Sequence, residues 1–169
     1  MNEHEIESLA AELGQRLLAH RSLVATAESC TGGLVAGAIT SIAGSSEWFD
    51  RGFVTYSNDA KHELLDVDES VLRAHGAVSE ATAVAMAQGA LKRSDAVLAV
   101  AVTGIAGPSG GTPEKPVGMV CFAWARKGAT VIRRTHHLSG NRAEVRQASV
   151  AIALRGLIDL VETTSRRDD

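Results

Sequence analysis

The chain has 169 residues, carries a formal net charge of −3, and is 45% hydrophobic but only 4% aromatic. This length fits one domain with a sizeable core, so we expect no second module. Nucleic-acid binding is disfavoured, because the composition offers neither a basic surface nor many aromatic side chains on which bases stack.

A helix is predicted over residues 3–19, where apolar residues recur with helical periodicity among acidic ones. This amphipathic segment resembles neither a signal peptide nor a transit peptide. No later apolar run is long enough to span a bilayer. We therefore expect a cytoplasmic protein with no membrane partner.

The next predicted elements are a buried strand over residues 23–27, a helix of small residues over 34–42 and a strand over 52–56. The helix is expected to pack closely on a sheet, because its side chains are small. Before the second strand lie Trp48 and Phe49, which either line a pocket or anchor their loop in the core or at a dimer contact.

Residues that favour helix N-caps predict three further helices. Asn58 or Asp59 is expected to cap a short helix, and Asp68 to open another. Ser79 is expected to cap a longer helix over residues 80–94. Its many alanines imply close packing against the sheet.

The second half of the chain predicts three strands and one long loop. Residues 96–102 are apolar on both faces, which is typical of a central strand. Residues 104–116 are rich in glycine and proline, and the length of this segment favours a functional loop. Strands over 117–125 and 130–137 are expected to pair antiparallel across a short turn, so the sheet should be mixed.

A final helix over residues 142–163 is predicted, because Asn141 and Glu144 form a capping-box pattern at its start. We expect residues 1–164 to form one domain and residues 165–169 to be a frayed, charged tail. The alternation of helices and apolar strands predicts an α/β fold, a three-layer α/β/α domain around a mixed, mostly parallel sheet.

The cysteines and histidines give no indication of a metal centre. Cys30 and Cys121 are the only cysteines, and their separation in apolar segments argues against a disulfide framework or a thiolate metal site. The six histidines lack the spacing of metal ligands. We therefore expect no bound metal.

Three polar residues fall where predicted strands end, namely Ser29, Tyr56 and Thr103. Ligands of α/β domains commonly bind beyond the carboxyl ends of the strands, so one shared pocket is expected there. Ser29 lies beside free N–H groups at a helix start, which can stabilise an alkoxide or an anionic group. Ser29 can therefore be a nucleophile, or else Ser29 or Thr31 only caps that helix.

A serine nucleophile needs a base, and Lys61 is the best candidate. A position in the first turn of a helix and partial burial both favour its neutral amine, and Tyr56 can pass a proton between the two. The alternative is that Lys61 is an ordinary surface lysine. Cys30 is a rival nucleophile without an evident histidine partner. Glu28 is not expected to be catalytic, because its charge opposes an oxyanion.

The glycine-rich loop can supply the other half of a hydrolase site. Backbone N–H groups of Thr103 and Gly104 can form an oxyanion hole or a phosphate nest, although a purely structural series of turns fits the same glycines. Lys115, Arg142 and Arg146 offer charges for a phosphate, and each of them also fits a solvated surface.

Three motifs together resemble one known family. They are TAESCTGGLVAGAITSIAGSSEWFDRGFVTYSNDAKHELLDV at residues 26–67, HGAVS at 75–79 and TGIAGPSGGTPEKPVGMV at 103–120. The chain is similar over nearly its whole length to the CinA C-terminal domain family. This resemblance implies an α/β/α homodimer that hydrolyses the carboxamide of nicotinamide mononucleotide to nicotinic acid mononucleotide and ammonia, as a step of pyridine nucleotide recycling.

The resemblance also implies roles for individual residues. It implies a Ser-Lys catalytic pair of Ser29 and Lys61, assisted by Tyr56, and no cofactor. The positions that it implies in substrate binding are Thr31, Gly32, Gly33, Thr103, Gly104, Gly107, Gly110, Gly111 and Arg142. Two other functions stay open, a nucleotide-binding regulatory domain without turnover and a hydrolase of another nucleotide amide.

Overall fold

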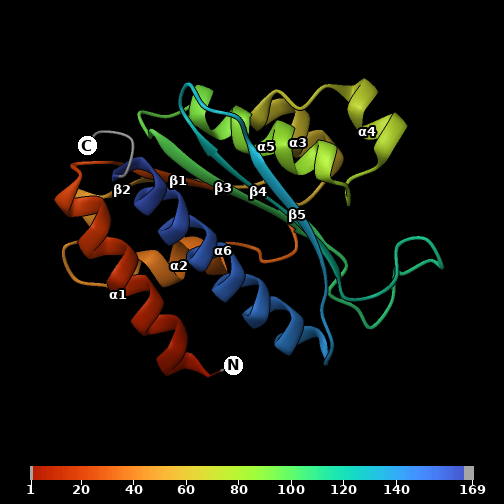
Figure 1. The fold of residues 1–169 in the computed structure, drawn as a ribbon. Coiled ribbons are helices and arrows are strands. Elements are labelled where there is room, and N and C mark those ends of the chain that lie inside the picture. Colours follow the sequence, from red (N-terminus) through yellow and green to blue (C-terminus); the bar gives the residue numbers. More distant parts are fainter. Residues whose placement is uncertain (1, 166–169) are drawn as a thin grey trace.

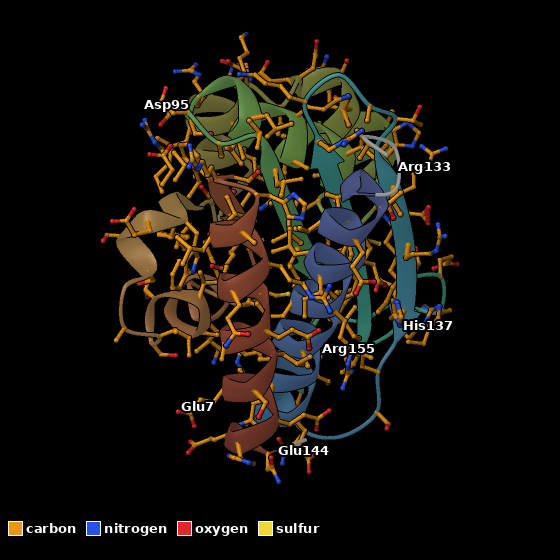
Figure 2. The ribbon with its side chains drawn as sticks, turned by 60° about the vertical axis from the view of Figure 1, so that its left-hand side comes forward. Glu7, Asp95, Arg133, His137, Glu144 and Arg155 are labelled. Atoms are coloured by element: carbon orange, nitrogen blue, oxygen red, sulfur yellow. The ribbon has the colours of Figure 1, made fainter. Side chains whose placement is uncertain are left out.

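The structure, a computed structural model, describes residues 2–165, with side chains as far as residue 163. A five-stranded sheet lies between two layers of helices (Figure 1). One layer contains α1 (Glu3–Ala19), α2 (Leu34–Thr40) and α6 (Arg142–Ser165), and the other contains α3 (Asn58–Leu65), α4 (Glu69–His75) and α5 (Glu80–Lys92). Figure 2 shows α1 and α6 side by side, with charged side chains such as Glu7 and Arg133 at the periphery.

The strands follow the order β2-β1-β3-β4-β5 across the sheet. Their bounds are β1 (Val24–Glu28), β2 (Phe49–Val54), β3 (Leu98–Gly104), β4 (Met119–Arg126) and β5 (Ile132–His137). β1 pairs in parallel with β2 and β3, whereas β4 pairs antiparallel with β3 and β5. The predicted three-layer α/β/α domain with a mixed sheet is confirmed. Because β2, β1 and β3 are parallel neighbours, their carboxyl ends meet at one edge of the sheet.

The two faces of the sheet bury side chains of different size. Toward α1, α2 and α6 the strands bury large side chains, including Val24, Val100, Val102, Val120, Phe122 and Trp124. Toward α5 they bury mostly alanines, namely Ala25, Ala27, Ala99, Ala101, Ala123 and Ala125. Since α5 adds buried alanines of its own, this helix and the sheet approach closely, as its composition predicts.

Side-chain caps begin five of the described helices, including α1, where Asn2 Oδ1 accepts from the Glu5 N–H. Asp68 caps α4 and Ser79 caps α5, as predicted. At the start of α6, Asn141 Oδ1 accepts from the Glu144 N–H and Glu144 Oε2 accepts from the Asn141 N–H, which confirms the capping box. The prediction for α3 is wrong by one or two residues, because its N-cap is Ser57, whose hydroxyl accepts from the Ala60 N–H.

Several boundaries differ from the predictions. β2 begins at Phe49 rather than at residue 52, because Phe49 is already in register with Val24 of β1. Trp48, just before it, is 5% exposed and lies in the core, where it covers Gly14 of α1. The α6 helix continues to Ser165, the first residue of the expected tail. The rest of that tail, residues 166–169, lies outside the described residues.

Within residues 2–165, no helix is both long and apolar enough to cross a membrane. The same described part of the chain contains no group of three or more histidine, cysteine, aspartate or glutamate side chains able to hold a metal ion. Cys30 and Cys121 are free and buried.

Candidate active site

Ser29 and Lys61 meet at the carboxyl edge of the parallel strands. Ser29 follows β1 directly, and Lys61 lies in α3, which follows the neighbouring strand β2. Lys61 Nζ lies 3.0 Å from Ser29 Oγ. Lys61 is 0% exposed and Ser29 is 8% exposed. The alternative of an ordinary surface lysine is therefore wrong.

The Lys61 amine has three oxygen atoms as neighbours. Besides Ser29 Oγ, these are the carbonyl oxygens of Thr55 at 2.8 Å and Tyr56 at 3.4 Å. A neutral amine has two N–H donors and one lone pair, so the two carbonyls can accept its protons while the lone pair faces the serine hydroxyl. No carboxylate is among these partners. The amine is therefore arranged to act as a base toward Ser29.

Burial is the main reason why the pKa of Lys61 lies below its ordinary value. Desolvation lowers the pKa of Lys61 to about 8 from an ordinary value of 10.5. Because Ser57 rather than Asn58 caps α3, Lys61 lies one position further from the helix start than predicted. The helix dipole therefore acts on the amine less strongly than predicted, since its effect falls off within the first turn.

The turn after Ser29 is fastened by the buried carboxylate of Glu28. Glu28 Oε1 accepts from the Thr31 hydroxyl at 2.7 Å and from the Val35 N–H at 2.8 Å, and Oε2 accepts from the Ala36 N–H at 3.0 Å. Glu28 and Thr31 are both 0% exposed. At Thr31, a position implied in substrate binding, the hydroxyl thus already has a partner within the protein.

Gly32 and Gly33 complete this turn in backbone conformations that favour glycine. Their φ angles are +57° and +102°, and Gly33 is the N-cap residue of α2. Neither residue has a side chain to cap that helix. Glu28 does so instead, from the end of the preceding strand.

Cys30 does not share the environment of Ser29. Its side chain belongs to the hydrophobic core between the sheet and the helices α1, α2 and α6, and the residue is 6% exposed. Desolvation raises the pKa of the Cys30 thiol to about 11. Since the thiolate is the reactive form, this environment disfavours Cys30 as the nucleophile.

The Tyr56 hydroxyl meets Arg142 rather than the Ser29–Lys61 pair. Arg142 Nη2 donates to Tyr56 Oη at 3.1 Å, and Arg142 Nη1 donates to the Gly107 carbonyl at 3.0 Å. Tyr56 is 61% exposed. Arg142, at the start of α6, thus links the end of β2 to the glycine-rich loop.

The side chains of Thr103 and Lys115 fasten the glycine-rich loop to the α4–α5 connection. Thr103 Oγ1 donates to the Ala77 carbonyl at 2.8 Å, and Lys115 Nζ donates to the His75 carbonyl. Gly104 adjoins β4 closely, because a Cβ atom there would lie 2.9 Å from the Met119 carbonyl oxygen. The two side chains therefore hold the loop in place, whereas the sequence suggested the Thr103 backbone and the Lys115 charge for ligand binding.

Gly110 and Gly111 lie in the exposed part of the same loop. In the described chain neither forms a hydrogen bond with Ser29 or Lys61. Among the residues expected at the site, Ser29 and Lys61 are in direct contact, whereas Tyr56, Arg142 and Gly107 form a second group.

Arg146 has a role that the sequence did not reveal. From α6, its Nε donates to the Cys30 carbonyl at 3.1 Å and its Nη2 to the Thr31 carbonyl at 3.3 Å. The sequence suggested only a charge for a phosphate. A contact to backbone carbonyls more than 100 positions away leaves no local pattern in the sequence. The only signal for this role was the presence of an arginine in the first turns of the last helix.

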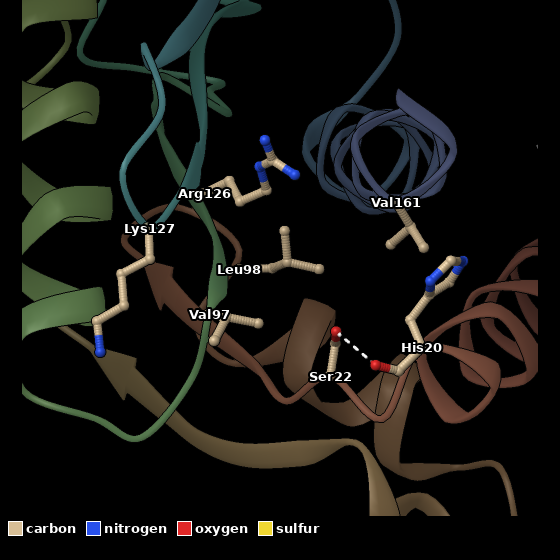
Figure 3. Close-up of a pocket in the computed structure, with 7 residues that line it drawn as sticks. All are labelled: His20, Ser22, Val97, Leu98, Arg126, Lys127 and Val161. Atoms are coloured by element: carbon tan, nitrogen blue, oxygen red, sulfur yellow. Dashed lines mark hydrogen bonds between the residues drawn. The ribbon is translucent and has the colours of Figure 1, made fainter. Parts of the chain in front are cut away.

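A cavity of about 220 Å³ lies at the opposite end of the sheet (Figure 3). Its lining residues are His20, Ser22, Val97, Leu98, Arg126, Lys127 and Val161. The Ser22 hydroxyl donates to the His20 carbonyl at 3.3 Å, as Figure 3 shows. Because the five residues of β1 span roughly 16 Å, this cavity is separate from the Ser29–Lys61 pair.

The family model described as the CinA C-terminal domain matches residues 6–161. A protein from Escherichia coli strain K12, named nicotinamide-nucleotide amidohydrolase PncC, is 53% identical over 157 residues, covering 93% of this chain and 95% of that protein. A CinA-like protein from Mycolicibacterium gilvum is 57% identical over 138 residues, covering 82% of this chain but 32% of that longer protein.

Solved structures of similar proteins share the fold. The crystal structure of a competence/damage inducible protein from Agrobacterium tumefaciens matches with a TM-score of 0.90 and 52% identity, covering 92% of this chain and 95% of that one. A CinA superfamily protein from Escherichia coli matches with a TM-score of 0.89 and 38% identity, covering 95% and 93% of the two chains.

Proposed function

Because the chain belongs to the CinA C-terminal domain family, we propose that it hydrolyses nicotinamide mononucleotide to nicotinic acid mononucleotide and ammonia, as a step of pyridine nucleotide recycling. The observation that carries this proposal is the contact between Ser29 and Lys61, which puts a nucleophile beside a buried amine with a lowered pKa. The relative named as a nicotinamide-nucleotide amidohydrolase supports the choice of substrate.

In the proposed first step, neutral Lys61 takes the hydroxyl proton of Ser29, and Ser29 Oγ bonds to the carboxamide carbon. The carbonyl oxygen becomes the oxyanion of a tetrahedral intermediate. When this intermediate collapses, the C–N bond breaks, and the amine leaves as ammonia with the proton that Lys61 returns. An ester between Ser29 and the nicotinoyl group remains.

In the proposed second step, water hydrolyses that ester. Lys61 takes a proton from the water molecule, whose oxygen bonds to the acyl carbon. The ester C–O bond breaks, and Ser29 Oγ recovers a proton from Lys61. The pair returns to its starting state, and nicotinic acid mononucleotide is released. Neither step needs a cofactor.

Backbone N–H groups near Ser29 are proposed to stabilise the oxyanion. Two of the groups considered already have acceptors, since Ser29 N–H donates to the Val102 carbonyl at 2.9 Å and Gly32 N–H to the Ser29 carbonyl at 3.0 Å. The N–H groups of Thr31 and Gly33 have no acceptor among the described residues, so both are candidates in the turn. One such donor is typically worth about 3 to 4 kcal/mol in the transition state.

Arg142 is proposed to bind the phosphate of the nucleotide. Its guanidinium is anchored by Tyr56 and Gly107 but lies at the exposed start of α6, where an anion can reach it. A planar guanidinium suits a phosphate, because two parallel N–H groups match two of its oxygens. The glycines of the neighbouring loop then allow the backbone to approach the ligand closely.

The test is ammonia release from nicotinamide mononucleotide, compared with nicotinamide, its riboside and the dinucleotide. We expect turnover of the mononucleotide by the wild-type protein and almost none by folded Ser29→Ala. Calorimetric binding without ammonia release would instead favour a regulatory nucleotide-binding domain. Preferred release from another of these amides would favour a hydrolase with a different substrate. A folded, fully active Ser29→Ala variant would contradict the mechanism.

We also propose that the protein forms a homodimer, which the family resemblance implies. β5 is an edge strand of the sheet, and its Ile132 is 40% exposed, so this edge is available to a partner. Light scattering on the purified chain should give twice the mass of one copy, whereas a single-copy mass at micromolar concentration contradicts the proposal.

A further inference from the structure

We propose that Glu28 and Arg146 are positioning residues that hold the turn from Ser29 to Gly33 between opposite charges, and so fix the groups that react with the substrate. This inference rests on the proposed amide hydrolysis. Neither residue contacts Ser29 Oγ or Lys61 Nζ through a hydrogen bond in the described chain. Each acts through the backbone of the turn.

The carboxylate of Glu28 holds the far end of the turn. It accepts three hydrogen bonds, from the Thr31 hydroxyl and from the N–H groups of Val35 and Ala36. Because Glu28 is the last residue of β1, its buried side chain ties α2 to the strand from which Ser29 emerges. Three donors on one buried carboxylate leave the segment between strand and helix little freedom to move.

The guanidinium of Arg146 holds the middle of the turn. It binds the carbonyls of Cys30 and Thr31, and a Cβ atom added to Gly32 would lie 3.5 Å from its Nη2. A trans peptide directs its C=O and N–H to opposite sides. Binding of the Cys30 carbonyl therefore directs the Thr31 N–H away from Arg146, and that N–H has no acceptor among the described residues.

The two charges thus sort the polar groups of the turn. The carboxylate takes N–H groups that follow the turn, and the guanidinium takes C=O groups within it. The N–H groups of Thr31 and Gly33 remain for a developing oxyanion. A preorganised donor stabilises a transition state because no reorganisation is needed when the charge develops. Loss of either charge should loosen this arrangement while Lys61 and Ser29 keep their side chains.

The first test measures amide exchange, which does not depend on turnover. We would compare wild type, Glu28→Gln and Arg146→Gln by NMR, with Arg155→Gln as the matched control on α6. Arg155 pairs with Glu5 on α1, away from the turn. We expect faster exchange of the Gly32 N–H, which donates to the Ser29 carbonyl, in the first two variants only. Unchanged exchange in both overturns the inference, even if the protein proves to have another substrate.

The second test measures kinetics with nicotinamide mononucleotide. In Glu28→Gln and Arg146→Gln we expect kcat to fall about 10- to 100-fold, with KM within about twofold of wild type, because a transition-state donor is displaced. The pKa of the pH–rate profile should not move, since neither residue bonds to Lys61. Higher KM at constant kcat in Arg146→Gln would mean phosphate binding and would overturn the inference for Arg146. Wild-type kcat in both variants would overturn it for both residues.

If the buried Glu28 variant does not fold, Arg146→Lys provides a second test of the same turn. A lysine at this half-buried position keeps the charge but lacks the forked guanidinium that binds both carbonyls at once. Its kcat should lie between those of wild type and Arg146→Gln, with the circular dichroism of wild type. A kcat of Arg146→Lys equal to that of Arg146→Gln also fits a need for the forked guanidinium. If Arg146→Gln is inactive but Arg146→Lys has the kcat of wild type, charge alone matters. That result would contradict the two-carbonyl geometry.

Discussion

Lys61 Nζ and Ser29 Oγ lie 3.0 Å apart although 32 positions separate the two residues in the chain. The contact follows from the parallel pairing of β1 and β2, which puts the residues after both strands at one edge of the sheet. Both residues are also buried. Proximity and burial together turn two weakly reactive groups into a candidate nucleophile and base.

Activity should depend on pH through Lys61. Burial lowers the pKa of Lys61 to about 8, and only the neutral amine can accept the Ser29 proton. We therefore expect kcat/KM for nicotinamide mononucleotide to rise tenfold per pH unit below about 8 and to level off above it. A pH–rate profile measured from about pH 6 to about pH 10 checks this expectation. A flat profile across that range would contradict Lys61 as the base.

Stability should also depend on the buried amine. The folded pKa of about 8 lies below the ordinary value of 10.5, so between these values the unfolded chain binds more protons than the folded protein. The free energy of unfolding should therefore gain a contribution that rises with pH over this interval, of roughly 3 kcal/mol in total. Urea unfolding of wild type and Lys61→Met at several pH values would measure it.

Lys61→Met should lack this contribution and be more stable than wild type near neutral pH, since an apolar side chain replaces a buried amine. Lys127→Met is the matched control, because Lys127 is exposed and should keep the pH dependence of wild type. An identical pH dependence in wild type and Lys61→Met would show that Lys61 keeps its ordinary pKa in the folded protein.

Tyr56 and Arg142 should act as a unit in substrate binding. The Tyr56 hydroxyl accepts a hydrogen bond from Arg142, so Tyr56→Phe removes a support of the proposed phosphate ligand. We expect Tyr56→Phe to raise KM about tenfold, which corresponds to a hydrogen bond to a charged group of about 1.5 kcal/mol. In Arg142→Gln the same tyrosine substitution should have little further effect. Steady-state kinetics of the two single variants and the double variant measure this coupling.

The other outcome assigns Tyr56 a different role. A fall in kcat of more than about 100-fold at constant KM would mean that the hydroxyl leaves Arg142 and transfers a proton near Ser29. The family resemblance implies a tyrosine that assists the Ser-Lys pair, whereas this structure shows its hydroxyl on Arg142. The double-variant comparison therefore decides between an assisting role and a binding role.

The fold and the central pair could be predicted because each depends on local pattern or on general rules of α/β topology. Apolar runs give the strands, capping residues give most helix starts, and parallel neighbours share an edge, so Ser29 and Lys61 were expected together. The partners of exposed or half-buried long side chains could not be predicted. Arg146 and Lys115 each reach backbone carbonyls far away in sequence, and backbone carbonyls leave no signature in the residues that carry them.

The N-cap of α3, which is Ser57 rather than the predicted Asn58 or Asp59, shows a related limit. Both serine and asparagine cap helices. Which of two adjacent residues begins the helix depends on where the backbone leaves the preceding strand, and the pairing of β2 sets that point. The shift of one position weakens the first of the two causes predicted for the lowered Lys61 pKa, the helix dipole, and leaves burial as the main one. Boundary errors of this size therefore matter for mechanism even where the fold is correct.

Cys30 should be dispensable for catalysis although it is the neighbour of Ser29. Its thiol lies in the core and its pKa is raised to about 11, so almost no thiolate exists near neutral pH. We expect Cys30→Ala to keep kcat and KM within about twofold of wild type and to lose about 1 kcal/mol of unfolding free energy, because a small buried side chain is truncated. Iodoacetamide should inactivate neither protein near neutral pH. Inactivation of wild type but not of Cys30→Ala would mean that the thiol is reachable and reactive, and would return Cys30 to consideration as the nucleophile.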